Sequence, residues 1–366
     1  MRIGLIAPPW VPVPPPAYGG TELVVDTLAR ALIRRGHEVA LFAVGSSTCP
    51  VPTSYLYREP PTPMGSSLHE AAHVLAASEA LADFHPDVIH DHTVLGPLLP
   101  TVDGSPRVLT HHGPFDAASR RVLAETAKRA AVVAISRSQA ADAGAVPIAA
   151  VILHGLDLDA YPAGDGHSGR LLFIGRMCAD KGADRAIRIA RAAGRDLTII
   201  TKIREQEERD YYDQAVAPLL GPDIEVAVEP DLGVKLDALR DAAALVNPIG
   251  WPEPFGLVMA EALACGTPVL AFPSGAAPEI VEDGVTGFLG DSESELAACV
   301  ERIATLDRSA CRAAAERRFG MDRMAADYED VYAAVAQAAD PPPRRWQTRR
   351  VRASEVAAIR RSVHLQ

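Results

Sequence analysis

The chain has 366 residues, 48% of them hydrophobic, and a formal net charge of −11 at pH 7. This length favours two domains over one, and the negative charge argues against a general nucleic-acid-binding protein. No stretch approaches about 18 uninterrupted apolar residues, and the N-terminus turns to prolines within a few residues, so we expect no membrane span and no signal peptide, and hence a cytoplasmic protein.

In the first half of the chain, short apolar runs alternate with helical segments. This alternation is typical of parallel α/β units. An amphipathic helix is predicted over 21–35, where Gly36 ends it. Strands are predicted over 2–7, 38–43, 87–90, 107–110, 131–136 and 150–153.

The segment 157–169 interrupts this rhythm with a proline and three glycines in a polar stretch, so we place an interdomain linker there. The pattern then restarts. A strand over 170–175, a helix over 183–193 and a strand over 197–201 open a second series that ends with a strand over 286–289. The chain is therefore predicted to form two doubly wound parallel-sheet domains that face each other across a cleft.

The most informative motif holds two glutamates, Glu253 and Glu261, eight positions apart between Trp251 and Val269. Prolines flank Glu253 and exclude regular helix, so a helix is expected to begin near Phe255 or Gly256 and to carry Glu261 about two turns in. Its first backbone N–H groups can receive an anion, and the two carboxylates can accept hydroxyl hydrogen bonds at opposite ends of an elongated ligand. A nucleotide sugar, with hydroxyls at both ends and a diphosphate between them, has this shape.

Cations and glycines are expected at the same place. Arg176 and Lys181 follow the first strand of the second domain, at the edge where open parallel sheets bind ligands, and can neutralise a diphosphate. Gly19 and Gly20 precede the first helix and let backbone amides approach the diphosphate from the other domain.

Histidines cluster after two strands of the first domain. His90 and His92 flank Asp91, and His111 and His112 follow the strand that ends at residue 110. Four histidines near one rim could form a zinc site, which stays an alternative to lining or packing beneath the cleft.

These motifs, in this order, resemble those of glycosyltransferase family 4, enzymes of the GT-B fold. The resemblance covers residues 1 to about 336 and rests also on 15–22, 35–39, 86–92, 109–113, 172–182 and 277–288. It implies an N-terminal acceptor-side Rossmann-like domain over 1–160, a C-terminal nucleotide-sugar donor-binding domain over 170–320, and a helix at about 321–336 that crosses back to the first domain.

The family likeness also implies the chemistry: a retaining, metal-independent transfer of a sugar from a nucleotide diphosphate sugar to an acceptor hydroxyl, without a cofactor. By this likeness the functional histidine is His112, with His111 the competing assignment. Catalytic roles are implied for His112, Glu253, Arg176 and Lys181, and donor binding for Gly19, Gly20, Arg176, Lys181, Glu253, Phe255, Gly256, Leu257 and Glu261.

Departures from the family pattern make the sugar and the base uncertain. The segment 274–279 replaces one that often carries paired glycines, so it narrows the space near the donor if it lines the site. No G-x-G-x-x-G motif follows a predicted strand, which argues against an NAD-dependent oxidoreductase. A sugar-nucleotide epimerase or hydrolase and a non-catalytic nucleotide-sugar-binding protein remain alternatives.

The residues 337–366 form a basic tail on an acidic protein. A solvated terminus is one interpretation. Contact with an anionic lipid surface, an acidic substrate or a second subunit is the other. The acceptor, a small molecule or a lipid-linked one, is not identified by the sequence.

Overall fold

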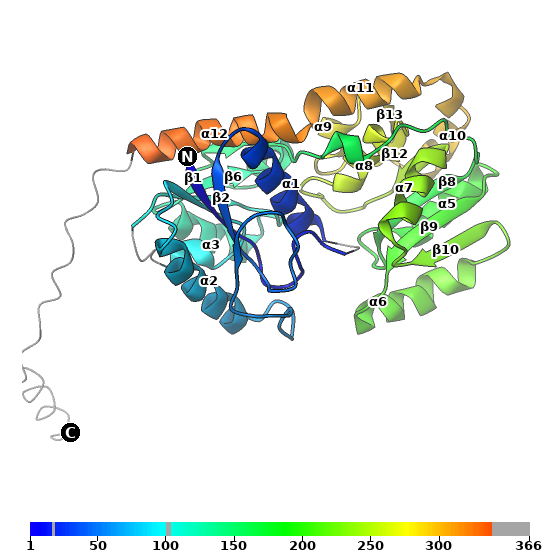
Figure 1. Ribbon diagram of the computed structural model, residues 1–366. Helices are drawn as coiled ribbons and strands as arrows, with labels where there is room; N and C mark the ends of the chain where they lie inside the picture. The colour runs from blue at the N-terminus through cyan, green and yellow to red at the C-terminus, as the bar shows by residue number, and fades with distance from the viewer. Residues whose placement is uncertain (17–18, 100–103, 339–366) are drawn as a thin grey trace, which may run out of the picture.

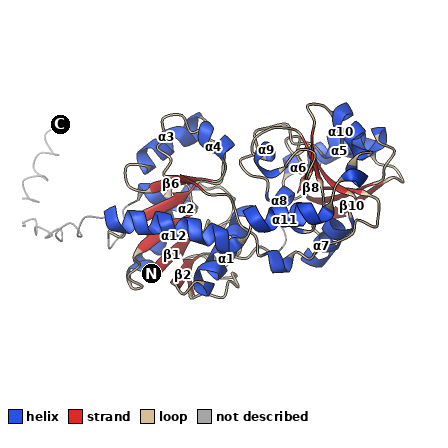
Figure 2. Ribbon diagram, turned by 90° about the horizontal axis from the view of Figure 1, so that it is seen from above, coloured by secondary structure: helices blue, strands red, loops and turns tan. Residues whose placement is uncertain are grey.

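The computed structural model describes residues 1–16, 19–99 and 104–338. The described chain forms two α/β units, each with a parallel sheet between layers of helices (Figures 1 and 2). The predicted fold class, two Rossmann-like domains facing each other, is confirmed. Most of the basic tail, from residue 339 on, lies outside the described residues.

The first sheet has seven strands in the order β3-β2-β1-β4-β5-β6-β7, all parallel. Its strands are β1 (Arg2–Ile6), β2 (Glu38–Phe42), β3 (Thr53–Ser54), β4 (Val88–Asp91), β5 (Arg107–Thr110), β6 (Ala131–Ala134) and β7 (Ala150–Val151). The helices are α1 (Gly20–Arg34), α2 (Ser67–Ala82), α3 (Ala117–Thr126) and α4 (Arg137–Ala141).

The second sheet has six parallel strands in the order β10-β9-β8-β11-β12-β13. Its strands are β8 (Leu171–Arg176), β9 (Leu197–Lys202), β10 (Ile224–Val228), β11 (Ala244–Asn247), β12 (Val269–Ala271) and β13 (Gly287–Leu289). The helices are α5 (Ala183–Ala192), α6 (Gln206–Tyr211), α7 (Leu232–Asp241), α8 (Leu257–Ala264), α9 (Ala277–Ile280), α10 (Glu293–Val300), α11 (Arg308–Arg318) and α12 (Met321–Ala338).

In both sheets the strand order reverses beside the first strand of the unit. β1 lies between β2 and β4, and β8 lies between β9 and β11. At such a point the loops at the carboxyl ends of the strands diverge and leave a crevice. The two crevices open toward the space between the units, where the predicted site residues are expected.

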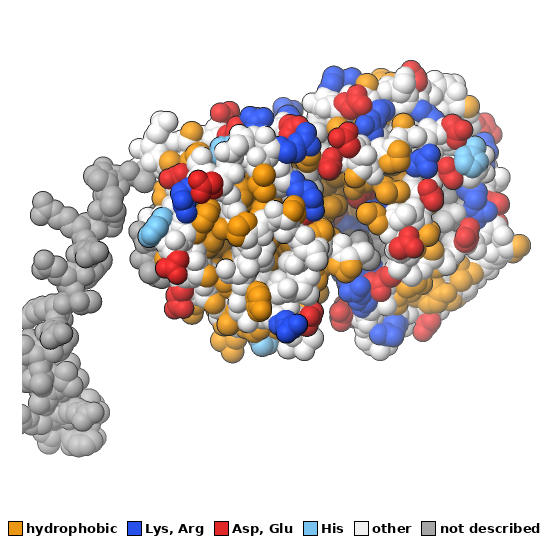
Figure 3. All heavy atoms as spheres, viewed as in Figure 1, with side chains coloured by type: hydrophobic (Ala, Val, Ile, Leu, Met, Phe, Trp, Pro, Cys, Tyr) orange, Lys and Arg blue, Asp and Glu red, His pale blue; other side chains and the backbone are white. Residues whose placement is uncertain are grey.

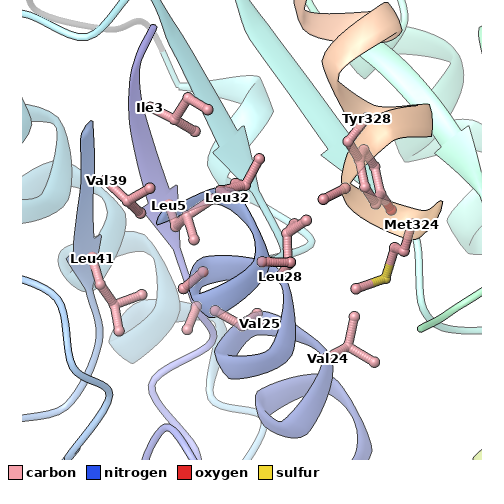
Figure 4. Packing of buried hydrophobic residues seen from close by; sticks show 14 of the residues in the cluster. Ile3, Leu5, Val24, Val25, Leu28, Leu32, Val39, Leu41, Met324 and Tyr328 are labelled. Atoms are coloured by element: carbon pink, nitrogen blue, oxygen red, sulfur yellow. The ribbon is translucent and has the colours of Figure 1, made fainter. Parts of the chain in front are cut away.

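Helix α12 follows the second unit in sequence but packs on the first. Met324, Tyr328 and Tyr332 are fully buried in the core of the first unit. Figure 4 shows Met324 and Tyr328 directed toward Val24 and Leu28 of α1. Hydrophobic periodicity predicts a helix here but not its partner, because any apolar face would satisfy the pattern.

None of the described helices is long and apolar enough to cross a membrane.

Candidate active site

A cavity of about 500 Å³ lies between the two units. The space-filling view shows the surface hollowed there (Figure 3). Both units line it, and every site residue named from the sequence except Arg176 is on its wall: Gly19, Gly20, His112, Lys181, Glu253, Phe255, Gly256, Leu257 and Glu261.

Two helix N-termini meet at this cavity. Gly19 precedes the first residue of α1, and Gly256 precedes α8 with φ of 87°, a left-handed conformation that favours glycine. A Cβ on Gly20 would lie 3.3 Å from Leu257 Cδ1, so the two helix ends approach each other closely across the cleft. Free N–H groups from both units therefore point into one region, which favours an anion there.

Glu253 and Lys181 form an ion pair on the wall of the cavity. Lys181 Nζ donates to Glu253 Oε2 at 2.6 Å, and both side chains are more than four-fifths buried. Lys181 Nζ also lies 5.7 Å from the centre of the Trp251 ring. The pair places a positive and a negative charge beside the N-terminus of α8.

The segment 274–279 supports Glu253 from behind and does not line the main cavity. The backbone N–H of Ala276 donates to Glu253 O at 2.9 Å. A Cβ on Gly275 would lie 2.3 Å from Glu253 O and 2.4 Å from Glu253 N, closer than real contacts allow. This segment thus supports the backbone of Glu253 at the cavity wall.

Glu261 is buried. It lies about one turn into α8, not two as expected, because the helix begins at Leu257, after Gly256. Its Oε1 accepts from Lys235 Nζ at 2.7 Å and from the Tyr161 hydroxyl at 3.0 Å. Sequence reasoning missed both partners, which come from α7 and from the linker.

His112 stands in a stack of rings that joins the two units. His112 Nε2 lies 2.9 Å from His92 Nδ1, and its ring centre is 5.1 Å from that of His154. His154 in turn lies 4.9 Å from the ring centre of Phe255 in the second unit. Burial, followed by the neighbouring His154 and His92, lowers the pKa of His112 well below its usual value, so this imidazole is neutral at pH 7.

The other two histidines of the proposed zinc site have different partners. His90 bonds Tyr332 and Thr110, both at 2.7 Å, and Thr110 bonds Tyr328 of α12 at 2.7 Å. His111 Nε2 bonds the carbonyl of Pro114 at 3.1 Å. Within the described ranges, three side chains converge closely enough to hold a metal ion only on the exposed surface, at Asp165, His167 and Asp241.

Glu279 makes a further contact between the units. Its carboxylate accepts from the backbone N–H groups of Arg137 at 2.9 Å and Ser138 at 2.6 Å, at the start of α4. On the same helix, the Gln139 side chain donates to the backbone carbonyls on either side of His112, at 2.9 and 2.7 Å. The second unit is thereby connected to the loop that carries His112.

Arg176 is the one predicted site residue that the cavity lining does not include. It ends β8, its side chain is 45% exposed, and its nearest acid is Glu208, with Nη1 3.8 Å from Oε1. Among the residues that the sequence did not reveal, His154 follows β7 at the carboxyl edge and could have been found by the argument used for His112. Lys235 sits within a helix and carries no such signal.

Two parallel α/β units, with a cavity between their carboxyl edges, are the architecture of the GT-B fold. AviGT4, a glycosyltransferase involved in avilamycin A biosynthesis, matches this structure with a TM-score of 0.68 and 25% sequence identity over 92% of this chain and 98% of its own. The model of the family described as Glycosyltransferase Family 4 matches residues 18–160, and that of Glycosyl transferases group 1 matches residues 165–318.

Relatives with similar sequences are also named as enzymes of this kind. D-inositol 3-phosphate glycosyltransferase of Xylanimonas cellulosilytica is 31% identical over 86% of this chain and 91% of its own length. Alpha-maltose-1-phosphate synthase of Mycobacterium tuberculosis is 29% identical over 79% of this chain and 84% of its own. The chain belongs to glycosyltransferase family 4 and is a nucleotide-sugar glycosyltransferase.

Proposed function

We propose that this enzyme transfers a sugar from a nucleotide diphosphate sugar to an acceptor hydroxyl with retention at the anomeric carbon and without a metal ion. The observation that carries the proposal is the cavity between the units. There, two helix N-termini, the Lys181–Glu253 ion pair and Glu261 line one cavity. The positive groups suit the diphosphate of a nucleotide sugar, and the two carboxylates suit the hydroxyls of its sugar and of its ribose.

In this arrangement the diphosphate would bind between Gly20 and Gly256. The ribose would bind Glu261, whose carboxylate is already oriented by Lys235 and Tyr161. Lys181 would exchange part of its interaction with Glu253 for the phosphate, and Glu253 would then hold the sugar hydroxyls. Phe255 and Leu257 would line the donor pocket.

Transfer would proceed on one face of the sugar. The acceptor oxygen forms its bond to the anomeric carbon on the side from which the diphosphate leaves, and the hydroxyl proton passes to the departing phosphate oxygen. Lys181 and the helix amides supply the positive charge that stabilises the phosphate, so no metal is needed in this scheme. Exposed Arg176 would add its charge by turning toward the phosphate when the cleft closes.

His112 would hydrogen-bond the donor sugar near its reacting carbon. Its neutral ring suits this role, because a neutral imidazole adds no positive charge beside a sugar that becomes cationic in the transition state. The names of the curated relatives support a small phosphorylated sugar or polyol as the first acceptor to test.

Thermal unfolding with a panel of UDP, GDP, ADP, TDP and their common sugars tests donor binding. A ligand at about 100 times its Kd stabilises the folded state by about 2.7 kcal/mol, which raises the Tm by several degrees. Glu261→Gln should weaken the response to the matching nucleotide. The absence of a shift with any nucleotide sugar would contradict the proposal.

Retention and metal independence are tested by analysing the reaction with the donor that the thermal panel identifies. The anomeric configuration of the product, read by NMR, tests retention, and unchanged rates in EDTA test metal independence. A hydrolase would release free sugar at the same rate with and without acceptor, whereas a binding protein would show a thermal shift and no turnover.

A further inference from the structure

His92 bonds one ring nitrogen of His112, Nε2, and leaves the other ring nitrogen, Nδ1, outside this bond. His92 follows β4, His112 follows the adjacent strand β5, and their facing nitrogens, Nδ1 and Nε2 respectively, are 2.9 Å apart. His92 is 4% exposed. Because His112 Nε2 is committed to this bond, Nδ1 is the ring nitrogen that remains for a ligand.

Each of the two rings carries a single proton at neutral pH. Burial lowers the pKa of both His92 and His112 well below the usual value, and the neighbouring histidines lower it further. One N–H must lie between the two rings, so there are two possible arrangements. In one His112 donates from Nε2, and in the other His92 donates from Nδ1.

The surroundings of His92 decide between the two. If His112 donated, the proton of His92 would have to sit on its Nε2, which is buried and has no hydrogen-bond partner in the described part of the chain. A buried N–H without an acceptor costs about 1–3 kcal/mol and is rarer than an unused acceptor. If His92 donates from Nδ1, only the lone pair of His92 Nε2 lacks a partner in the described part of the chain, and His112 carries its proton on Nδ1.

We propose that His92 is a positioning residue that fixes His112 as the Nδ1–H tautomer, so that His112 presents a hydrogen-bond donor to an oxygen of the donor sugar. The inference rests on the proposed role of His112 in sugar binding. It also assigns a function to His92 of the His-Asp-His motif at 90–92, which the donor site alone does not use.

The tautomer is measurable without any substrate. Two-bond proton–nitrogen correlation on the full chain labelled with ¹⁵N-histidine distinguishes a protonated Nδ1 from a protonated Nε2, and His112→Asn identifies the signals of His112. We expect a protonated Nδ1 on His112 and on His92 in the unmodified enzyme. A protonated Nε2 on His112 would overturn the proposal.

Two variants of His92 separate positioning from folding. His92→Asn retains an amide N–H close to the place of Nδ1 and should keep the His112 tautomer, whereas His92→Leu removes the donor and should release it. Turnover of the nucleotide sugar should fall about 10- to 100-fold in His92→Leu with little change in donor KM, and His92→Asn should recover most of it. An unchanged His112 tautomer in folded His92→Leu would also overturn the proposal.

His73→Asn is the matched control. His73 is a fully buried histidine of α2 that bonds the carbonyl of Ala7 at 3.0 Å and does not line the cavity. Its substitution tests the cost of losing a buried imidazole, and Tm values compare the folding of all variants. If the tautomer is as expected but His112 variants transfer sugar normally, the proposed role of His112 is wrong while the positioning by His92 stands.

Discussion

Gly275 is the position where one added carbon atom should damage the donor site most directly. A Cβ there would lie 2.3 Å from Glu253 O, 2.4 Å from Glu253 N and 2.7 Å from Pro252 C. These neighbours are backbone atoms and cannot rotate away. Contacts under 3.0 Å are essentially never seen, so in Gly275→Ala the new Cβ and the backbone of Glu253 must separate by about 0.7 Å, the difference between 3.0 and 2.3 Å, and we expect Glu253 to make part of this movement.

That displacement moves the Glu253 carboxylate and its partner Lys181 together. A misplacement of about 1 Å in a binding group can cost about 100-fold in rate, so we expect kcat/KM for the donor to fall about 10- to 100-fold. The assay is release of nucleoside diphosphate from the donor identified by the thermal panel. Circular dichroism and Tm establish that the variant is folded.

Gly284→Ala is the matched control for Gly275→Ala. Gly284 lies in the same unit with φ of 74°, and a Cβ there meets nothing within 4 Å. Gly275 has φ of 58°, so both variants pay about 1 kcal/mol for a left-handed alanine, but only Gly275→Ala meets the backbone. Full activity of a folded Gly275→Ala enzyme would refute the reasoning that this segment sets the position of Glu253.

Three further predictions address closure, pH dependence and the anchoring of α12. Glu279→Ala removes two charge-assisted bonds to α4, each worth about 1.5–3 kcal/mol before solvent screening, and should raise donor KM about tenfold and increase the radius of gyration of the ligand-bound enzyme in X-ray scattering. An unchanged radius and KM would exclude a role in closure. Burial raises the pKa of Glu22 to about 7, above the 4.5 of an ordinary glutamate, so the unfolded chain releases this proton first and stability falls as pH rises from 4.5 to 7. In urea unfolding, the stability of Glu22→Gln relative to the unmodified protein should therefore increase by about 2.5 kcal/mol between pH 5 and 8, and a constant difference would contradict this. Tyr328→Phe removes the hydroxyl that bonds Thr110 and should cost about 1 kcal/mol in the same measurement, with no loss expected if α12 does not anchor the histidine network.

Local rules predicted much of the fold and many of the residues that line the cavity. Strand β5 was predicted with its observed limits, Arg107–Thr110, and the glutamate motif gave the loop and helix that bring Glu253 and Glu261 to one cavity. These features depend on chain-local patterns, such as an apolar run before polar residues or a glycine that allows a left-handed turn. A single sequence records such patterns directly.

Contacts between distant segments were not predictable in the same way. The pairing of His92 with His112 requires β4 and β5 to be neighbours in register, and the Glu279 contact requires the two units to be placed relative to each other. The segment 274–279 was expected to narrow the donor pocket if it lined the site, but it packs against the backbone of Glu253 and does not line the cavity. Composition could not distinguish these effects, because both depend on which surface the segment faces.

Several contacts between the two units lie beside the cavity. They include Gly20 against Leu257, the ring of His154 against Phe255 and the two hydrogen bonds of Glu279. Ile135 of the first unit also packs in the hydrophobic core of the second. For a donor to enter and a nucleotide to leave, a cleft of this kind has to open and close. Because these contacts reach Phe255 and the loop of His112, a closure that excludes water would also order the groups proposed to hold the sugar.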